Sequence, residues 1–574
     1  MKLRIKYYYN IIIVVPFIVL LPSRTLYLLF KANPSSIYIH ISENSKQMPF
    51  IRIIKMMQFQ LKLIIILLSI CKLITIVHAK APGHLQPVLG WNTWCTQNQC
   101  GNDWCTEKEI ISVGKSMKEN GLLDAGYEYL NLDDCWGVRN NETNHIEADA
   151  KRFPSGMKSL VSKIHKLGFK LGIYTDMGSN GCHHPFTGSW PFYYQDAIDF
   201  SNWGIDYVKF DYCDPPKGYL PEQLTANMSN ALKNTNIWLN FHCNWLTFEN
   251  SNCGIFGNSF RIAPDHIDAW YSTVKTSHAL MSRKPWWGDN NNNNNNNNGD
   301  NDKGFPDPDF VFTGGQGCGE HGTINPPGIR CPGQSDEEYR TEFGINVIAS
   351  GQILFASDPR NMSQIQKEIL LNGEVLSVFK DTSGLTNVLQ IHKQNSIIPT
   401  NPNDCNVQLT KQLSHGSGCV KGVDFGCINN NNNNTYEIWV ANGCRAMFSC
   451  YGTKNVNCES GGNSFPNHNN ITCNCNPPSP QIWIRRLKNV SQIAVLLVNI
   501  ADESNDITIQ FKDILSQYYY YPKMKNKRLL SSPSLITANV RDLFKKKDLG
   551  KYHSNYTAIQ VAPHASIFLR LGII

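Results

Sequence analysis

The chain has 574 residues, of which 41% are hydrophobic and 17% are charged, so it has the composition of an ordinary globular protein and the length for two or three domains. Its formal net charge is +7, but residues 1–79 contain ten lysines and arginines and one acid, and the rest of the chain is close to neutral with 43 basic and 45 acidic side chains. This balance excludes a general nucleic-acid surface, so we expect no nucleic-acid partner.

Two apolar runs, Ile11–Leu21 and Leu61–Val77, precede the globular part. Read from Met56 or Met57, the second run resembles a complete signal peptide that ends in the small residue Ala79. We expect residues 1–79 to be a leader, with the true start at Met56 or Met57 and cleavage before Lys80. The alternative is a leader that carries a membrane anchor, and a mature N-terminus far from Lys80 would contradict the signal-peptide interpretation.

Nineteen cysteines are present, and one of them, Cys71, lies in the leader, which leaves the even number of 18. The chain also has seven N-x-S/T sequons, at Asn141, Asn227, Asn361, Asn433, Asn470, Asn489 and Asn555. Together these features predict the secretory pathway, with a secreted or lysosomal location, and disulfide bonds. Zinc is the alternative use of so many cysteines, but the sequence has no C-x2-C pair that meets a matching second pair or an H-x3–5-H motif, and we expect no metal and no cofactor.

From Pro87 onward, β-favouring runs alternate with amphipathic segments. The predicted strands are Val88–Asn92, Tyr127–Asp133, Lys170–Thr175, Tyr207–Phe210, Ile237–His242, Phe260–Ala263, a poorly patterned one near Phe305–Phe310, and Ile353–Ser357. The predicted helices are Glu107–Asn120, Met157–Leu167, Tyr194–Trp203, Pro221–Lys233, Ile267–Met281 and Asp336–Ile348. This alternation predicts an α/β fold, a (β/α)8 TIM barrel over residues 80–392. The asparagine run Asn290–Asn298 is interpreted as a surface insertion without function.

The alternation ends near Gln390, and residues 393–574 are expected to form a C-terminal antiparallel β-sandwich domain. Residues 400–478 contain eight cysteines and many Gly, Asn and Pro residues, which is typical of an insertion held by disulfides. Short alternating strands follow and predict the sandwich: Gln481–Leu487, Ile493–Val498, Ile507–Phe511, Tyr556–Val561 and Ser566–Leu571.

The run Ile205–Cys213 carries the most informative charges. Lys209 and Asp211 interrupt a short β-favouring stretch two residues apart, so on a strand they point to the same face. Burying both is costly unless they form a structural pair or take part in chemistry. Catalytic groups of a (β/α) barrel lie at the C-terminal ends of its strands, and Asp211 is our candidate nucleophile.

Polar residues also gather at the ends of the other predicted strands, in G-W-N-T-W (90–94), Y-L-N-L-D-D-C-W (129–136), Y-T-D (174–176), H-C-N-W (242–245), F-R-I-A-P-D (260–265) and F-P-D-P-D-F (305–310). So many polar residues at the same end of one barrel indicate an active site there. Retaining glycoside hydrolysis needs a nucleophilic carboxylate, a second carboxyl group as acid and base, and polar and aromatic partners for the sugar. Lys209 would favour the ionised form of Asp211, whereas Asp265 would have to hold a proton.

These blocks, with V-R-D-L-F-K-K-K-D-L-G near the C-terminus (540–550), resemble the α-galactosidase (melibiase) family, glycoside hydrolase family 27. The resemblance covers roughly residues 85–400 and resumes in the sandwich. It implies a barrel followed by a β-sandwich and the release of a terminal α-linked galactose, with retention, from oligosaccharides, glycolipids or glycoproteins. The partner it implies is a carbohydrate substrate, and because members of the family often dimerise, a homodimer is a further expectation.

Placed on this chain, the resemblance makes Asp211 the nucleophile and Asp265 the acid/base. It implies a set of substrate-binding residues: Trp94, Asp133, Asp134, Tyr174, Lys209, Asn244, Arg261 and Asp309. It also implies a disulfide between Cys182 and Cys213. We further expect Cys243 to pair with Cys253, and Cys135 to pair with Cys95 or Cys100.

Asn244 departs from the family pattern. Galactosidases of the family resemble C-E-W at this point, with a glutamate for the sugar 2-hydroxyl, and the N-acetylgalactosaminidases have a smaller serine. Asparagine can hydrogen-bond a hydroxyl and is shorter than glutamate, so it decides neither case. The alternatives to an α-galactosidase are therefore an α-N-acetylgalactosaminidase, a β-L-arabinopyranosidase, or a galactose-binding protein without catalysis.

Overall fold

The computed structural model describes a defined part of the chain. The described residues are 17–20, 26–31, 36–41, 86–95, 101, 104–182, 185–243, 253, 256–263, 265–282, 304–313, 333–381, 386–390, 407–412, 419–421, 423–430, 435–440, 444–450, 453–459, 471–474, 480–489, 491–519 and 536–574. The chain divides into two units, Met1–Val77 and His78–Ile574. The first contains a three-stranded antiparallel sheet of β1 (Phe17–Leu20), β2 (Leu26–Lys31) and β3 (Ser36–Ile41), which the sequence analysis did not predict. Within the described residues, no helix has the length and apolar character needed to span a bilayer.

Eight parallel strands form the sheet of the second unit, which confirms the predicted barrel. In chain order they are β4 (Leu89–Asn92), β5 (Tyr129–Asn131), β8 (Lys170–Asp176), β9 (Tyr207–Asp211), β10 (Trp238–His242), β11 (Ser259–Arg261), β12 (Phe305–Asp307) and β13 (Ile353–Phe355). Each strand pairs with its sequence neighbour, and β13 returns to pair with β4. Between β12 and β13 the ring is completed by a parallel bridge of Val311 with Phe355.

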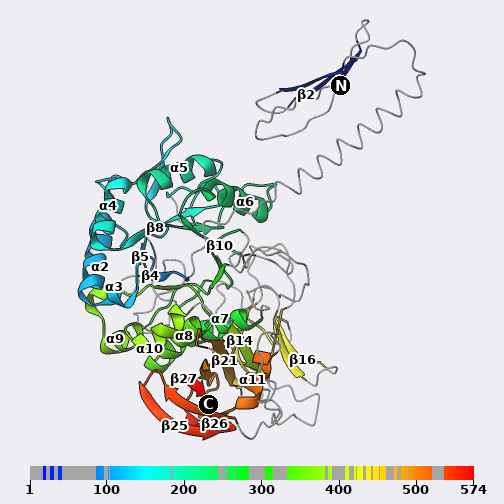
Figure 1. The fold of residues 1–574 in the computed structure, drawn as a ribbon. Helices are drawn as coiled ribbons and strands as arrows, with labels where there is room; N and C mark the ends of the chain where they lie inside the picture. The colour runs from blue at the N-terminus through cyan, green and yellow to red at the C-terminus, as the bar shows by residue number, and fades with distance from the viewer. Residues whose placement is uncertain are drawn as a thin grey trace. The chain divides into compact units, whose positions relative to one another are not determined.

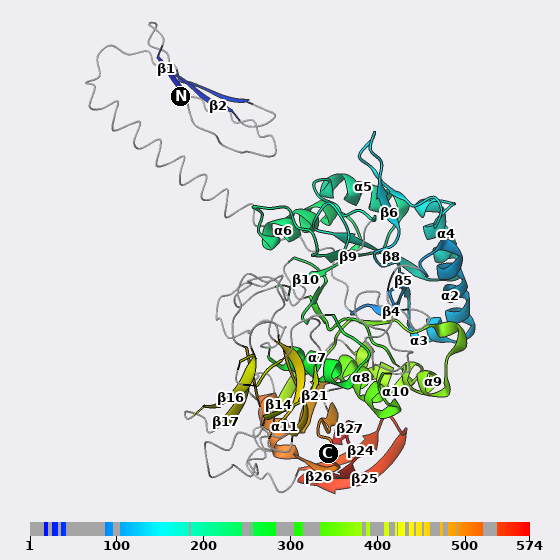
Figure 2. The ribbon, with the colours of Figure 1, turned by 180° about the vertical axis from the view of Figure 1, so that it is seen from behind.

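The barrel helices follow the strands as predicted, with small shifts at their ends. They are α2 (Glu107–Glu119), α4 (Met157–Leu167), α5 (Tyr193–Trp203), α6 (Pro221–Leu232), α7 (Trp270–Ser282) and α8 (Asp336–Ile348), with the short α3 (Leu122–Ala125), α9 (Gln364–Leu370) and α10 (Gly373–Lys380) added. Figures 1 and 2 show α2, α4, α5 and α6 on the outside of the strands. Helix α7 begins at Trp270, three residues later than predicted, because the residues before it belong to the turn that carries Asp268.

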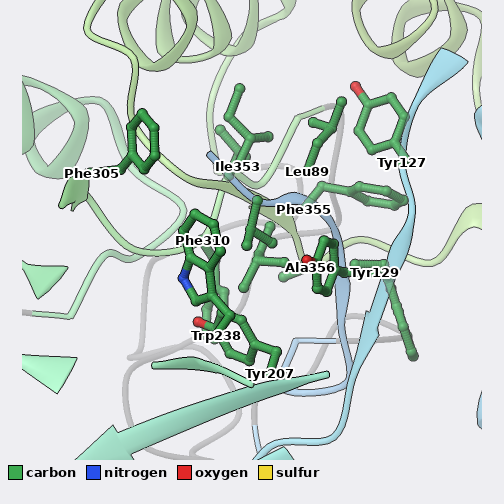
Figure 3. Packing of buried hydrophobic residues seen from close by; sticks show 14 of the residues in the cluster. Leu89, Tyr127, Tyr129, Tyr207, Trp238, Phe305, Phe310, Ile353, Phe355 and Ala356 are labelled. Atoms are coloured by element: carbon green, nitrogen blue, oxygen red, sulfur yellow. The ribbon is translucent and has the colours of Figure 1, made fainter. Parts of the chain in front are cut away.

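Large apolar side chains fill the barrel interior (Figure 3), where aromatic residues from different strands meet. Trp238 of β10 stacks on Phe305 of β12 with ring centroids 5.9 Å apart, and Tyr129 of β5 meets Tyr207 of β9 edge to face at 6.2 Å. The side chain of Asn131 fills the space beside Gly172 of β8, where a Cβ would lie only 2.0 Å from its Oδ1. The interior is thus a packed core that holds the strand ends in place.

The C-terminal part is an antiparallel sandwich, as predicted. A six-stranded sheet contains β14 (Thr386–Gln390), β21 (Gln481–Arg486), β22 (Gln492–Val498), β27 (Ser566–Ile573), β24 (Thr537–Asp542) and β25 (Lys547–His553), in that order. A second, two-stranded sheet consists of β23 (Asn505–Gln510) and β26 (Asn555–Val561), with α11 (Phe511–Tyr519) beside it. The sequence analysis missed β14, β24 and β25.

The cysteine-rich insertion forms two small antiparallel sheets around a core of its own. One contains β15 (Val407–Gln412), β18 (Arg445–Cys450) and β19 (Thr453–Glu459), and the other contains β16 (Phe425–Asn430), β17 (Thr435–Val440) and β20 (Ile471–Asn474). Disulfides Cys419–Cys444 and Cys458–Cys473 hold it, as the composition predicted.

Candidate active site

Polar side chains converge at the C-terminal ends of five neighbouring strands. They come from the turn after β5 (Asp133), from β8 (Tyr174 and Asp176), from β9 (Lys209 and Asp211), from β10 (His242) and from β11 (Arg261). Asp309, two residues beyond β12, joins them. Because a parallel barrel brings these strand ends to one rim, residues far apart in sequence form one cluster.

Asp211 is the last residue of β9 and is almost fully buried. Its Oδ1 lies 2.6 Å from Nε2 of His242 and accepts a hydrogen bond from the backbone N–H of Tyr212 at 3.0 Å. Its Oδ2 has only longer contacts, at 3.7 Å to Nζ of Lys209 and 3.6 Å to Sγ of Cys182. Burial alone would raise the pKa of Asp211, but the positive charges of His242 and Lys209 outweigh burial and hold this pKa well below its usual range.

Lys209 links the nucleophile candidate to the first of the paired aspartates. Its Nζ donates to both oxygens of Asp133 at 3.1 Å and lies over the rings of Tyr174 and Phe310, 5.3 Å from each centroid. Burial lowers the pKa of Lys209, and Asp133 with Asp211 outweighs that effect, so the pKa is raised and the ammonium stays charged. This places a fixed positive charge between two carboxylates.

Arg261 is a second buried cation between two carboxylates, on the other side of the site. Its Nη2 lies 2.9 Å from Oδ1 of Asp265 and 3.1 Å from Oδ2 of Asp309. Arg261 and Asp309 are buried, whereas the side chain of Asp265 is 46% exposed. The backbone N–H of His266 donates to Asp309 at 2.7 Å, which fastens the segment that carries Asp265. The structure therefore brings one buried and one accessible carboxylate to the same rim.

The remaining predicted residues lie around this centre. Asp134 is buried beside the loop after β8, where a Cβ on Gly181 would lie 2.3 Å from its Oδ1. Tyr174 is buried, its hydroxyl donates to Sγ of Cys182 at 3.0 Å, and burial raises its pKa well above the usual range. Trp94 is half-buried after β4, where its backbone N–H donates to Asn92 at 2.8 Å. Asn244 lies outside the described residues.

Three disulfides brace the loops at this rim. Cys182–Cys213 joins the loops after β8 and β9, and Cys243–Cys253 joins the end of β10 to the segment before β11, which are the expected pairs. The expected partner of Cys135 was wrong, because the structure pairs Cys135 with Cys105 rather than with Cys95 or Cys100. Cys105 lies just before α2, and the N–H of Glu107 in the first turn of this helix bonds to Arg152 O, so the helix start lies beside the loop after β5.

Three residues of the site were missed in the sequence. His242 faces Asp211 directly, Asn92 donates to Oδ2 of Asp133 at 2.9 Å, and Asp176 accepts the N–H groups of Gly178 and Cys213 at 2.7 and 2.8 Å. All three stand in the strand-end motifs, and the alternation of side chains along β10 puts His242 on the same face as the inward Asn240. That alternation was the signal that could have found His242.

Among the described residues, one group of acidic and sulfur-containing side chains has metal-like spacing: Asp176, Cys182, Asp211 and Cys213. Its two sulfurs are bonded to each other and are not thiolates. The cluster is therefore a disulfide beside two carboxylates, and its chemistry does not suit a metal ion.

Comparisons with known proteins agree with this geometry. The model of the family described as alpha galactosidase A matches residues 86–381, and that of the alpha galactosidase C-terminal beta sandwich domain matches residues 478–571. An α-galactosidase of Oryza sativa is 34% identical over 304 residues, which are 52% of this chain and 64% of the rice protein. α-Galactosidase 2 of Arabidopsis thaliana is 32% identical over 52% of this chain and 68% of its own length.

Solved structures share the fold at low sequence identity. α-Galactosidase I from Mortierella vinacea matches with a TM-score of 0.53 and 22% identity over 85% of this chain and 97% of that structure. A β-L-arabinopyranosidase from Geobacillus stearothermophilus matches with a TM-score of 0.56 and 16% identity, over 85% and 97%. With both domains matched in order, this chain belongs to the α-galactosidase family, glycoside hydrolase family 27.

Proposed function

We propose that this chain is a retaining α-galactosidase that releases terminal α-linked galactose from a carbohydrate substrate, with Asp211 as nucleophile and Asp265 as acid/base. The observation that carries the proposal is the contrast between these two carboxyl groups. Asp211 is buried among positive charges that keep it ionised, while Asp265 is half exposed beside Arg261. Two carboxyl groups in different environments are what a retaining glycosidase requires.

In the first step Asp211 attacks the anomeric carbon as the glycosidic C–O bond breaks, and Asp265 gives its proton to the leaving oxygen. The exposure of Asp265 suits this role, because the leaving group must depart toward solvent and water must enter from the same side. In the second step Asp265 takes a proton from that water, whose oxygen bonds to the anomeric carbon and releases Asp211.

The other charged groups suit a sugar bearing several hydroxyls. Asp133 and Asp134 supply acceptor oxygens on the side of β5, and Lys209 and Arg261 supply donors between the carboxylates. Trp94 and Tyr174 offer aromatic surface, and Asp309 fixes Arg261. Asn244, in its C-N-W motif, is proposed to contact the sugar 2-position. Charged donors and acceptors of this kind reject analogues that lack the matching hydroxyl.

Hydrolysis of p-nitrophenyl α-galactoside and p-nitrophenyl α-N-acetylgalactosaminide at mildly acidic pH tests the proposal. We expect cleavage of the galactoside, and we expect Asp211→Asn to lower kcat on the order of 10³-fold or more while the variant still binds galactose. Preference for the acetamido sugar would replace the proposed substrate. Normal hydrolysis by Asp211→Asn would show that Asp211 is not the nucleophile. If the natural protein binds galactose but does not hydrolyse either substrate, it is a sugar-binding protein without catalysis.

We also propose that the chain enters the secretory pathway and is N-glycosylated. Four of the sequon asparagines are exposed, namely Asn141, Asn361, Asn489 and Asn555, and disulfides occur in both the barrel and the insertion. Disulfides persist in oxidising compartments. Protein recovered from its own host should gain electrophoretic mobility after treatment with an N-glycanase, and unchanged mobility would contradict this proposal.

A further inference from the structure

We infer that His242 is a positioning residue for the nucleophile: it holds Oδ1 of Asp211, leaves Oδ2 to attack the sugar, and supplies the counter-charge that keeps this carboxylate ionised. The inference rests on the proposed function and deepens it at the same site. It concerns a residue to which the proposed function assigns no part in the reaction.

The two oxygens of Asp211 have different surroundings. Oδ1 is occupied by Nε2 of His242 at 2.6 Å and by the N–H of Tyr212 at 3.0 Å, whereas the contacts of Oδ2 to Lys209 and Cys182 lie at 3.7 and 3.6 Å. Because Oδ1 has both short contacts and Oδ2 has only longer ones, Oδ2 is the oxygen left to attack. The contacts to Oδ1 hold the carboxylate plane in one orientation.

The neighbouring charges explain why the histidine matters. Lys209 lies on β9 beside Asp211 but is closer to Asp133, at 3.1 Å, than to Asp211. Arg261 is the β11 residue opposite His242 in the sheet register, and it is shared by Asp265 and Asp309. Both permanent cations are thus balanced by other carboxylates.

His242 itself is buried, with 5% of its side chain exposed. The other ionisable groups facing this corner are Tyr174 and Asp176 on β8. Neither ring nitrogen of His242 makes a hydrogen bond of regular geometry to the described residues, and Nε2 has its short contact, 2.6 Å, with Oδ1 of Asp211. The short contact to Asp211 is therefore the interaction that orients the ring. Of the groups that can carry positive charge, His242 lies closest to the nucleophile.

The chemistry follows both steps of the reaction. When Oδ2 bonds to the anomeric carbon and the glycosidic bond breaks, Oδ1 becomes the carbonyl oxygen of the ester, and Nε2 of His242 remains beside it. When water attacks and the ester C–O bond breaks, the electron pair returns to Oδ2, and the charge that reappears on the carboxylate is stabilised by the nearby imidazole of His242. Neither step needs a proton transfer to or from His242.

The test compares His242→Gln with the natural enzyme and with His165→Gln. His165 forms a similar pair with Asp206, 2.8 Å apart, on the exposed outside of the barrel, so it is a matched control. The pH dependence of kcat/KM is measured with p-nitrophenyl α-galactoside, and circular dichroism with thermal melting checks the fold. Because loss of His242 raises the pKa of the nucleophile in the free enzyme, we expect His242→Gln to move the acidic limb upward and to lower kcat about tenfold, with no change in His165→Gln.

A second variant, His242→Ala, is assayed with added imidazole, which should restore activity several-fold by occupying the space of the missing ring. An unmoved acidic limb in His242→Gln, or no rescue of His242→Ala by imidazole, overturns the inference. If His242→Gln does not fold, the rescue experiment decides alone. Failure of the natural enzyme to hydrolyse the galactoside would instead overturn the proposed function, so the two failures are distinguished.

Discussion

At the residue scale, Lys209 is the charge on which the buried carboxylates depend. It bonds to both oxygens of Asp133 and lies 3.7 Å from Asp211, with 14% of its side chain exposed. A buried ion pair adds little by itself, but removing one partner leaves an uncompensated charge. The site and the fold therefore both require this lysine.

Replacing Lys209 by methionine keeps the length of the side chain and removes its charge. We expect a loss of about 3–5 kcal/mol in the free energy of unfolding, together with a fall in kcat/KM on the order of 100-fold, because Asp133 and Asp211 lose their shared counter-charge. Urea unfolding and steady-state kinetics measure the two effects. The control is Lys170→Met in β8, whose exposed pair with Glu128 is worth less than about 1 kcal/mol. Equal effects of the two changes would contradict this view of Lys209.

The sequence predicted that Asp211 and Lys209 lie together because two charges at alternating positions in a short β run point to the same face of a strand. It did not predict His242, because the alternation of side chains along β10 shows only that this histidine faces inward and not that it lies opposite Asp211. The distance to Asp211 depends on the register of β9 with β10, and that register is a property of the sheet. The predicted partner of Cys135 was wrong for a similar reason, because disulfide connectivity depends on the path of the loops in three dimensions.

At the scale of elements, the disulfide Cys182–Cys213 ties together the two loops that follow β8 and β9. Tyr174 donates to Sγ of Cys182, which itself lies 3.6 Å from Asp211, so the crosslink is part of the wall around Asp211. Loops positioned by a rigid scaffold carry the function of a barrel enzyme.

Changing Cys182 and Cys213 together to alanine should lower the free energy of unfolding by about 2–4 kcal/mol, because the bond closes a loop of 31 residues. It should also lower kcat/KM about tenfold or more, since the wall beside Asp211 loses its contacts. Thermal melting and kinetics on the galactoside measure both. The matched control, Cys458 and Cys473 both to alanine, removes a disulfide from the insertion and should leave kcat/KM unchanged. If kcat/KM fell only when Cys458 and Cys473 were changed, the prediction would be contradicted and the insertion, not the Cys182–Cys213 disulfide, would support catalysis.

The elements of the barrel were predictable because strands and helices alternate with clear patterns, whereas parts of the sandwich were not. The segment Val540–Gly550 was recognised as a family motif, but its strands, β24 and β25, were missed. All seven residues of β25 are at least partly exposed, so it lacks the buried apolar run that marks a strand in sequence.

At the scale of the molecule, the sandwich shares a core with the barrel. Trp483, Leu496 and Phe568 of the large sheet belong to the same buried cluster as the barrel residues. Polar contacts reinforce the junction, where Asn372 donates to the carbonyl of Leu543 at 3.0 Å and Arg541 pairs with Glu374 at 2.7 Å. The two parts should therefore unfold together.

The change Phe568→Ala tests this coupling. Because Phe568 is fully buried, we expect a loss of about 3–5 kcal/mol and a matching fall in the temperature at which galactosidase activity is lost. The control is Ile559→Ala in β26, where the side chain is 73% exposed and the effect should stay within about 0.5 kcal/mol. Unchanged thermal inactivation in a clearly destabilised Phe568→Ala variant would show that the barrel folds without the sandwich.

Two buried aspartates make the stability of the whole molecule depend on pH. Burial raises the pKa of Asp268 to about 7, and burial with the charge of Asp211 raises that of Asp176 to about 7. As pH rises from about 4 to about 7, the unfolded chain loses these protons while the folded protein retains them. Stability therefore falls through this window, by about 4 kcal/mol for each group.

We expect a higher melting temperature at pH 5 than at pH 7.5. Asp268→Asn should reduce the difference, because asparagine can still accept the hydrogen bond from Tyr339 but does not titrate. The comparison uses thermal melting of both proteins across pH 4–8. A variant with the same pH dependence as the natural protein would contradict the raised pKa of Asp268.

The most direct measurement on the central claim is covalent trapping of the nucleophile. The enzyme is incubated with a fluorinated galactosyl substrate that forms the glycosyl-enzyme quickly and loses it slowly, and the labelled peptide is sequenced by mass spectrometry. We predict a single label on Asp211, in the peptide containing Lys209–Cys213. A label on Asp265 or on any other residue, or turnover of a galactoside without any trapped intermediate, would contradict the account.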